Sequence, residues 1–273
     1  MVEVLVHFVA PALVGVLIGI ASGLLGIGGG TVMVPIFRLA FGMSATMSTA
    51  TSLFAIIPTS ISGVISHVKG KTCIPALGIA AGLGGACLSP VGVWLAQLSP
   101  DWLVMLAAAL IIGYSAINMF KKAFKLRPAG QPAAEADAAA PTADDSSLSR
   151  KQLLQGAAIG LVAGLASGYV GVGGGFIMVP LMLSIIGIPM RKASGTSLIA
   201  VMILAIPGVI EQGIIGNINY LAGIAIVIGT IPGAVIGARL VTKVPERTLR
   251  LLFGCFLIVA AVMLVLNEVG IFG

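Results

Sequence analysis

Charged residues are scarce in this chain of 273 residues, of which only 9% are Asp, Glu, Lys or Arg. About a quarter of the residues in a soluble domain are charged, so a soluble globular protein is nearly excluded. Hydrophobic residues make up 58% of the sequence. At about 20 residues per span, the chain has room for about eight to ten membrane helices. We therefore predict an all-α polytopic membrane protein.

Histidine and cysteine are also rare, with two and three copies. The cysteines form no CxxC pair and lie near no histidine cluster, so we expect no metal, no cofactor and no catalytic residue. The net charge is +6, but the basic residues occur singly or in pairs, which argues against nucleic acid as a partner. The expected partners are the lipid bilayer and a small molecule, and the chain could also form a homo-oligomer.

One polar stretch, residues 121–151, interrupts the apolar sequence. Its Ala, Pro, Asp and Ser content cannot bury a core, so we predict a flexible linker there. It divides the chain into a first transmembrane repeat, 1–120, and a second, 152–273.

The two halves are copies of each other at an offset of 145 residues. Residues 22–35 read SGLLGIGGGTVMVP and residues 167–180 read SGYVGVGGGFIMVP, with nine of 14 positions identical. Internal repetition of this kind points to two related structural units. The same offset aligns further glycines and a Thr-Ser-Leu triplet, so the repeat covers most of each half.

The apolar segments that follow the glycine triplets, 31–41 and 176–187, are unusually short. At 1.5 Å per residue each is about 17 Å long, whereas the hydrocarbon core is about 30 Å thick. We predict that they are half-helices. Each would form a Gly-broken hairpin with the helix before it, followed by three transmembrane helices.

The basic residues favour one membrane topology, because Lys and Arg next to spans prefer the cytoplasm. If each hairpin returns to its own side, the repeats are inverted, and 14 of the 15 basic residues share one side, with Arg38 as the exception. If each Gly-rich unit instead spans the membrane, the repeats are parallel and the count shows no bias. We therefore predict inverted repeats with a cytoplasmic linker.

The glycine triplets mark the predicted binding site. Backbone that leaves the helical conformation within a membrane must be buried in protein or line a watery cavity. A helix that begins after the glycines presents free N–H groups and the positive end of its dipole to an anion. Inverted repeats would bring two such ends together near the midplane. The predicted substrate-binding residues are Gly28, Gly29, Gly30 and Thr31, and Gly173, Gly174, Gly175 and Phe176.

Polar residues of the following helices are second candidates. Hydroxyl groups near a helix start can donate to an oxoanion, and capping without a ligand is the alternative. Glu211 and His67 could couple protons, since ionisable groups in spans are functional candidates; a place at the membrane interface is the alternative. The hydroxyl candidates that both repeats retain are Thr51, Ser52, Thr196 and Ser197.

These Gly-rich motifs, one in each half of a short chain with many apolar segments, resemble the sulfite exporter TauE/SafE family of membrane transporters. The resemblance implies a multi-pass protein of the bacterial inner membrane. It also implies a secondary transporter, working by alternating access, of sulfite or an organosulfonate such as sulfoacetate, with export as the expected direction. The substrate would pass the two glycine regions.

Two other functions are weighed. A passive anion channel could use the same site, although duplicated half-helices favour a transporter. An intramembrane serine hydrolase could use Ser22 or Ser167 as its nucleophile. It would need a base within hydrogen-bond reach, and the second repeat has Gln212 where the first has His67, so we do not expect an enzyme.

Overall fold

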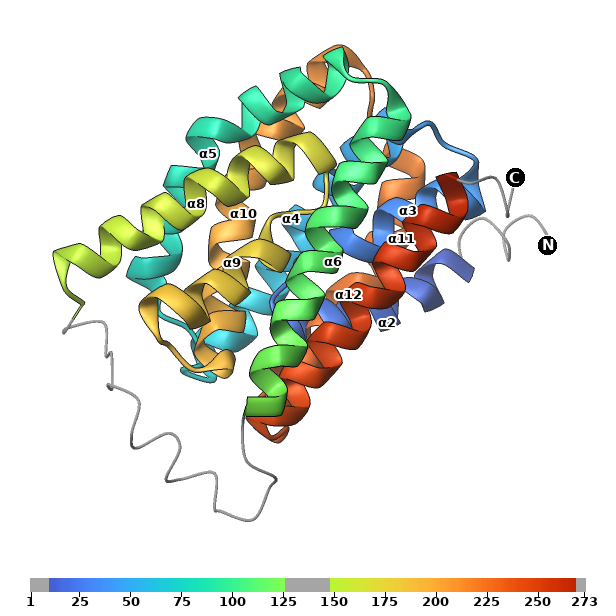
Figure 1. Ribbon diagram of the computed structural model, residues 1–273. Coiled ribbons are helices and arrows are strands. Elements are labelled where there is room, and N and C mark those ends of the chain that lie inside the picture. The colour runs from blue at the N-terminus through green and yellow to red at the C-terminus, as the bar shows by residue number, and fades with distance from the viewer. Residues whose placement is uncertain (1–9, 126–147, 269–273) are drawn as a thin grey trace.

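The computed structural model describes residues 10–125 and 148–268, which form helices joined by short turns (Figure 1). The helices of the first half are α2 (Ala10–Leu25), α3 (Gly30–Phe41), α4 (Ala45–Lys69), α5 (Pro75–Leu98) and α6 (Asp101–Lys125). Those of the second half are α8 (Arg150–Val170), α9 (Gly175–Leu181) with the π-helical turn η3 (Met182–Ile186), α10 (Met190–Ile215), α11 (Tyr220–Leu240) and α12 (Glu246–Glu268).

Among the described residues, seven helices are long and apolar enough to cross a membrane. They are α4, α5, α6, α8, α10, α11 and α12. The all-α polytopic fold is thus confirmed. Both predicted half-helices are present as short elements, α3 with 12 residues and α9 with seven, the latter extended by η3. Helix α8 has 21 residues and is long enough to span the membrane. The sequence predicted this segment as one arm of a hairpin, followed by three full crossings.

Helices enter the predicted linker, 121–151, from both ends. Helix α6 continues to Lys125, and α8 already begins at Arg150. A capping box sets that start: the Ser149 hydroxyl accepts from the backbone N–H of Lys151 at 3.3 Å, and the Gln152 side chain accepts from the Ser149 N–H at 3.1 Å. The rest of the predicted linker, residues 126–147, lies outside the described residues.

The two halves are interleaved. Helix α2 of the first half packs on α11 of the second, and α8 of the second packs on α5 of the first. Helix α4 packs on α10, and α6 on α12 (Figure 1). Exchanging the halves converts each of these pairs into another observed pair or into itself. The packing therefore follows the sequence repeat, and each half completes the core of the other.

Glycines make the contact between α2 and α11 close. A Cβ atom on Gly15 would lie 2.5 Å from the carbonyl oxygen of Ile226, and Gly19 and Gly23 meet the backbone of the same helix. In the second repeat Gly160, Gly164 and Gly168 meet the backbone of α5 in the same way. Their spacing of four is the small-residue pattern of membrane helix packing.

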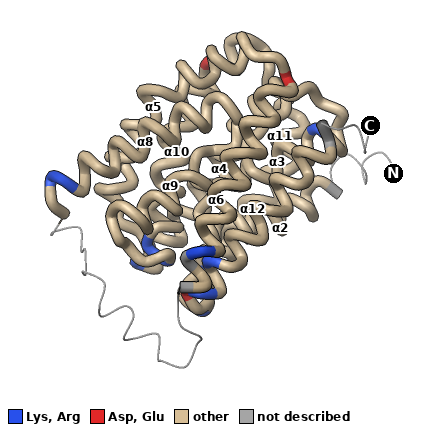
Figure 2. Tube along the Cα trace, in the orientation of Figure 1, with Lys and Arg blue, Asp and Glu red and all other residues tan. Residues whose placement is uncertain are grey.

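Basic residues gather at one end of the bundle. Figure 2 shows Lys and Arg where α6 ends and where α8 begins, with one blue segment apart from the others near the end of α3. Arg38 is the basic residue in the last turn of α3. The centre of the bundle, where α4 and α10 cross, is free of Lys and Arg in the described part of the chain.

Candidate functional site

The turn between α2 and α3 requires glycine. Gly28 has φ 81° and Gly29 has φ 85°, and their counterparts Gly173 and Gly174 have φ 86° and 67°. These are left-handed conformations, which cost an L-residue with a side chain roughly 1–2 kcal/mol. The glycine triplets of the sequence therefore correspond to two chain reversals of the same geometry, here called loop 1 (residues 26–29) and loop 2 (residues 171–174).

The two loops meet each other in the centre of the bundle. A Cβ atom on Gly30, the first residue of α3, would lie 2.5 Å from the carbonyl oxygen of Val172 in loop 2. A Cβ atom on Gly175, the first residue of α9, would lie 2.9 Å from the Cα atom of Ile27 in loop 1. The starts of α3 and α9 are thus close together, as the sequence predicted for the two half-helices.

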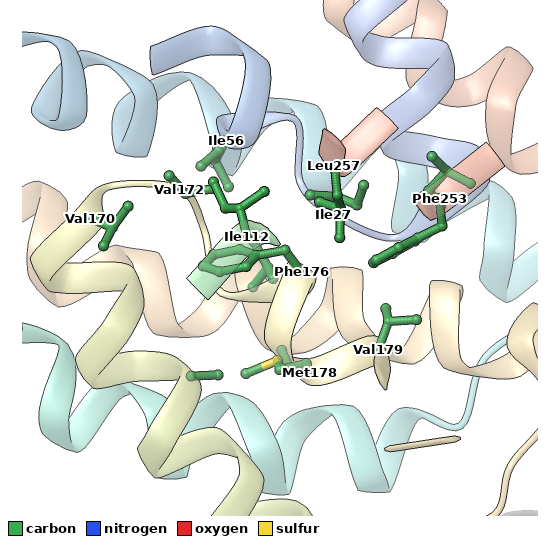
Figure 3. Packing of buried hydrophobic residues seen from close by; sticks show 14 of the residues in the cluster. Ile27, Ile56, Ile112, Val170, Val172, Phe176, Met178, Val179, Phe253 and Leu257 are labelled. Carbon is green, nitrogen blue, oxygen red and sulfur yellow. The ribbon is translucent and has the colours of Figure 1, made fainter. Parts of the chain in front are cut away.

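Apolar side chains close the junction between the loops. Ile27, Val172 and Phe176 are fully buried and belong to the main hydrophobic cluster together with Ile56 of α4. Figure 3 shows Phe176 beside Ile112 of α6, with Ile27 and Val172 nearby. Phe176, predicted to bind substrate, is therefore a core residue in this conformation, and the junction is shut.

The first turn of α3 has free hydrogen-bond donors. The backbone N–H groups of Gly30 and Thr31 donate to no acceptor among the described residues, whereas those of Val32 and Met33 donate to the carbonyl of Gly29. At the start of α9 the N–H of Phe176 is also free within the described residues, but that of Gly175 donates to Gly173 at 2.8 Å. The two helix starts are therefore not equivalent as anion sites.

Thr51 and Thr196, which both repeats retain, have structural partners. The Thr51 hydroxyl accepts from the backbone N–H of Asn219 at 3.0 Å, and the Thr196 hydroxyl accepts from that of Ile74 at 2.9 Å. Asn219 and Ile74 precede α11 and α5 and are themselves equivalent positions. Each threonine therefore fixes the start of a helix in the opposite half, which accounts for its presence in both repeats.

Ser197 lies against loop 1, and its repeat counterpart Ser52 is buried without a partner. The Ser197 hydroxyl donates to the carbonyl of Gly26 at 2.7 Å. The Ser52 hydroxyl makes no hydrogen bond within the described residues. The start of α4 approaches loop 2 through Thr49, which packs on Gly171. Ser197 and Thr49 thus bring each long central helix against the loop of the other half.

Carboxylates of the protein already cap the starts of α4 and α10. Asp101 accepts from the backbone N–H of Ala45 at 3.2 Å, and Glu246, at the equivalent position, accepts from that of Met190 at 3.4 Å. A negative charge at a helix N-terminus is stabilising, but it also repels a second anion. These two helix starts are therefore poor anion sites compared with the start of α3.

His67 is buried near the end of α4 and both of its ring nitrogens have partners. Nε2 lies 2.8 Å from the carbonyl oxygen of Gly23, so it carries the proton, and Nδ1 lies 2.7 Å from the Thr72 hydroxyl, which donates to it. Gln212 and Asn217 are the counterparts of His67 and Thr72 in the second repeat, and there the side-chain oxygen of Gln212 accepts from the side-chain amide of Asn217 at 2.8 Å. The imidazole thus has a structural role in tying α4 to α2.

Glu211 stands one position before Gln212 and is half-buried. Its Oε2 atom is buried without a hydrogen-bond partner in the described part of the chain. Neither Glu211 nor His67 is among the nearest neighbours of the glycines in loop 1 and loop 2. Proton coupling by these two residues remains a prediction.

The structure contains several buried hydroxyls without partners, of which the sequence had predicted Thr31 and Ser52 as binding residues. Ser22 precedes loop 1 and Ser167 precedes loop 2, and both had been considered only as hydrolase nucleophiles. Their presence in both copies of the motif was a signal for a site, whereas Ser60 carries no such signal because the second repeat has Ala205 there. The described residues with an unpartnered buried hydroxyl are Ser22, Thr31, Ser48, Ser52, Ser60, Ser89 and Ser167.

Comparisons with known proteins agree with this architecture. A family model described as Sulfite exporter TauE/SafE matches residues 11–264. The probable membrane transporter protein YunE of Bacillus subtilis is 28% identical over 277 residues, covering 97% of this chain and 99% of the relative. A second relative from that organism, YdhB, has a probable membrane transporter name and is 28% identical over 239 residues, covering 87% and 92%. A probable membrane transporter of Haemophilus influenzae is 28% identical over 275 residues, covering 93% and 97%. No solved structure matches significantly.

Proposed function

We propose that this chain, which belongs to the sulfite exporter TauE/SafE family, exports a small sulfur-containing oxoanion as a secondary transporter. The chain is a multi-pass membrane transporter, given its seven apolar helices, the family match and the names of its relatives; a place in the bacterial inner membrane fits these findings. The family description supports sulfite as a substrate, and an organosulfonate such as sulfoacetate has the same anionic oxygens.

The observation that carries this proposal is the meeting of loop 1 and loop 2. Each precedes a short helix whose start is equivalent to roughly half a positive charge, so the pair could hold about one negative charge. The central part of α4 and α10 offers no Lys or Arg for that task. Backbone dipoles would therefore provide the attraction, which suits a monoanion better than an amine or a sugar.

The closed junction supports alternating access rather than an open pore. Ile27, Val172 and Phe176 have no exposed surface, so an anion can pass only after the loops move apart. The exchanged packing of α2 on α11 and α8 on α5 would allow the loops to open toward either side by equivalent movements. The basic residues at one end support inverted repeats, which transporters of this kind use to alternate.

A counterflow measurement tests this function. Purified protein is reconstituted into vesicles that contain unlabelled sulfite, labelled sulfite is added outside, and its uptake is followed against empty vesicles. A transporter exchanges the two pools, so preloading should accelerate uptake. Sulfoacetate is measured in parallel. Uptake that does not respond to preloading would favour the passive anion channel, and no uptake of either anion would reject the substrate class.

A further inference from the structure

The two repeats differ in polarity next to the loops. Position 31 is Thr in the first repeat, and its counterpart, position 176, is Phe. Position 60 is Ser, and its counterpart, position 205, is Ala. The backbone of the two loops is alike, with the same left-handed glycines, but hydroxyl groups are concentrated around loop 1.

Two of these hydroxyl-bearing side chains lie against loop 1. The Ser60 Oγ atom is 3.6 Å from the position that a Cβ atom would occupy on Gly28. The Ser22 Cβ atom is 3.6 Å from the corresponding position on Gly29. Both serines have 0% exposed surface, and neither Oγ atom has a hydrogen-bond partner in the described residues.

The start of α3 adds further donors at the same place. Thr31 is also fully buried with an unpartnered hydroxyl, and its N–H and that of Gly30 are unused within the described chain. Buried polar groups normally have partners, so several unsatisfied donors beside one loop call for an acceptor. An oxoanion has several acceptor oxygens and no need of a donor in return.

Loop 2 has Phe176 and Ala205 where loop 1 has Thr31 and Ser60. A Cβ atom on Gly173 would meet the Cδ1 atom of Ile56 at 2.7 Å, and one on Gly174 would meet the carbonyl oxygen of Ala163 at 3.0 Å. Ser167 provides the unpartnered hydroxyl at this loop. Helix α9 continues into the π-helical turn η3, so its dipole resembles that of α3, but the N–H of Gly175 at its start already donates to Gly173.

We propose that the substrate oxoanion binds to loop 1 rather than equally between the two loops. Its oxygens accept from the hydroxyls of Ser22, Thr31 and Ser60 and from the N–H groups of Gly30 and Thr31. Loop 2, with Val172 and Phe176, forms the apolar wall that opens and closes over them. This assignment rests on the proposed transport function and makes that site one-sided despite the repeated sequence.

Binding to serine variants tests the assignment. Purified full-length protein in detergent is titrated with sulfite and, separately, with sulfoacetate, and the Kd values are measured by calorimetry. Loss of a hydrogen bond to a charged group should raise Kd about tenfold in Ser22→Ala and in Ser60→Ala. Ser167→Ala, the repeat counterpart of the Ser22 change, is the matched control and should bind as the wild type does.

A relocation variant separates loss of one contact from general damage. In Ser60→Ala with Ala205→Ser the hydroxyl moves to the second repeat, and we expect the weak binding to persist. Each variant must keep the wild-type elution volume and Tm. An alanine variant that loses either is replaced by Ser22→Thr or Ser60→Thr. These threonine variants keep a hydroxyl and should bind as tightly as the wild type.

The outcomes distinguish this assignment from the proposed function. Equal weakening by Ser22→Ala and Ser167→Ala, or recovery of binding in the relocation variant, would show a site shared by both loops and overturn the one-sided assignment while leaving the transport function standing. Wild-type binding by both Ser22→Ala and Ser60→Ala would also overturn it. If the wild type neither binds nor transports sulfite or sulfoacetate, the proposed function fails and the assignment fails with it.

Discussion

A methyl group added to Gly30 or Gly175 should push the two glycine loops apart. In Gly30→Ala the new Cβ atom would lie 2.5 Å from the carbonyl oxygen of Val172. Carbon and oxygen approach to about 3.3 Å without strain, so the loops must separate by roughly 0.8 Å. In Gly175→Ala the new atom would meet the backbone of Gly26 and Ile27. Because the added Cβ atom overlaps with backbone atoms in both variants, no side-chain rotation relieves the contact.

The expected cost follows from overpacking a closed core, typically about 1–3 kcal/mol. We expect each variant to lower the free energy of unfolding by about 2 kcal/mol. If the same strain opposes the closed state during transport, the population of that state falls by about five- to 150-fold. Sulfite efflux from reconstituted vesicles should therefore drop strongly in both variants, even at a temperature where the protein is folded.

Gly42→Ala and Gly187→Ala are matched controls. Both glycines follow the half-helices with positive φ, 60° and 78°, and have no atom within 4 Å of an added Cβ. An alanine at either position is forced into the left-handed conformation, which costs roughly 1–2 kcal/mol, but its methyl group does not press on either loop. Thermal unfolding and sulfite efflux are measured for all four variants. Efflux by Gly30→Ala at the level of Gly42→Ala would refute the reasoning that the loop junction must close.

Three further predictions concern the helices around the loops. His67→Gln, which copies the residue at position 212, should keep wild-type sulfite efflux because an amide can also donate to Gly23 and accept from a hydroxyl; loss of efflux with an unchanged Tm would assign a proton-carrying role. Thr51→Val removes the acceptor for the backbone N–H of Asn219 and should lower the free energy of unfolding by about 1–3 kcal/mol, with the sulfite Kd unchanged; weaker binding at unchanged stability would instead support a ligand role. In a chain without native cysteines, Gly216→Cys should react with an impermeant reagent in intact cells and Arg150→Cys should not; the reverse pattern would contradict the inverted arrangement.

The main features of the fold could be predicted because they depend on local sequence. The length of an apolar segment determines whether it can span a bilayer, and a glycine run indicates where a membrane helix breaks. The two half-helices followed from these patterns. The ends of the linker did not, since the start of α8 depends on the capping box between Ser149 and Gln152.

The roles of the hydroxyl residues could be predicted only in part. Comparing the repeats selected Thr51 and Thr196, because both copies retain them. Their partners, Asn219 and Ile74, are 168 and 122 residues away along the chain, and only the packing of one half on the other brings them together. A shared residue can thus reflect the shared architecture as well as a shared ligand.

Comparison of the repeats could not have selected Ser60. Its counterpart is Ala205, so a search for retained positions discards it. What marks Ser60 is its complete burial beside Gly28 with an unpartnered hydroxyl, and burial of a polar group emerges only from the assembled core. Departures from the repeat, rather than its retained positions, distinguish the polar loop from the apolar one.

Efflux of sulfite from vesicles at a clamped potential tests the central claim most directly. The purified protein is reconstituted into vesicles loaded with sulfite, and the potential is set with potassium and valinomycin. Outward movement of one negative charge is favoured by about 2.3 kcal/mol per 100 mV when the interior is negative. We predict efflux that depends on the protein, accelerates as the interior becomes more negative, and is strongly reduced in Gly30→Ala. Absence of protein-dependent efflux of sulfite and of sulfoacetate at every potential would contradict the account.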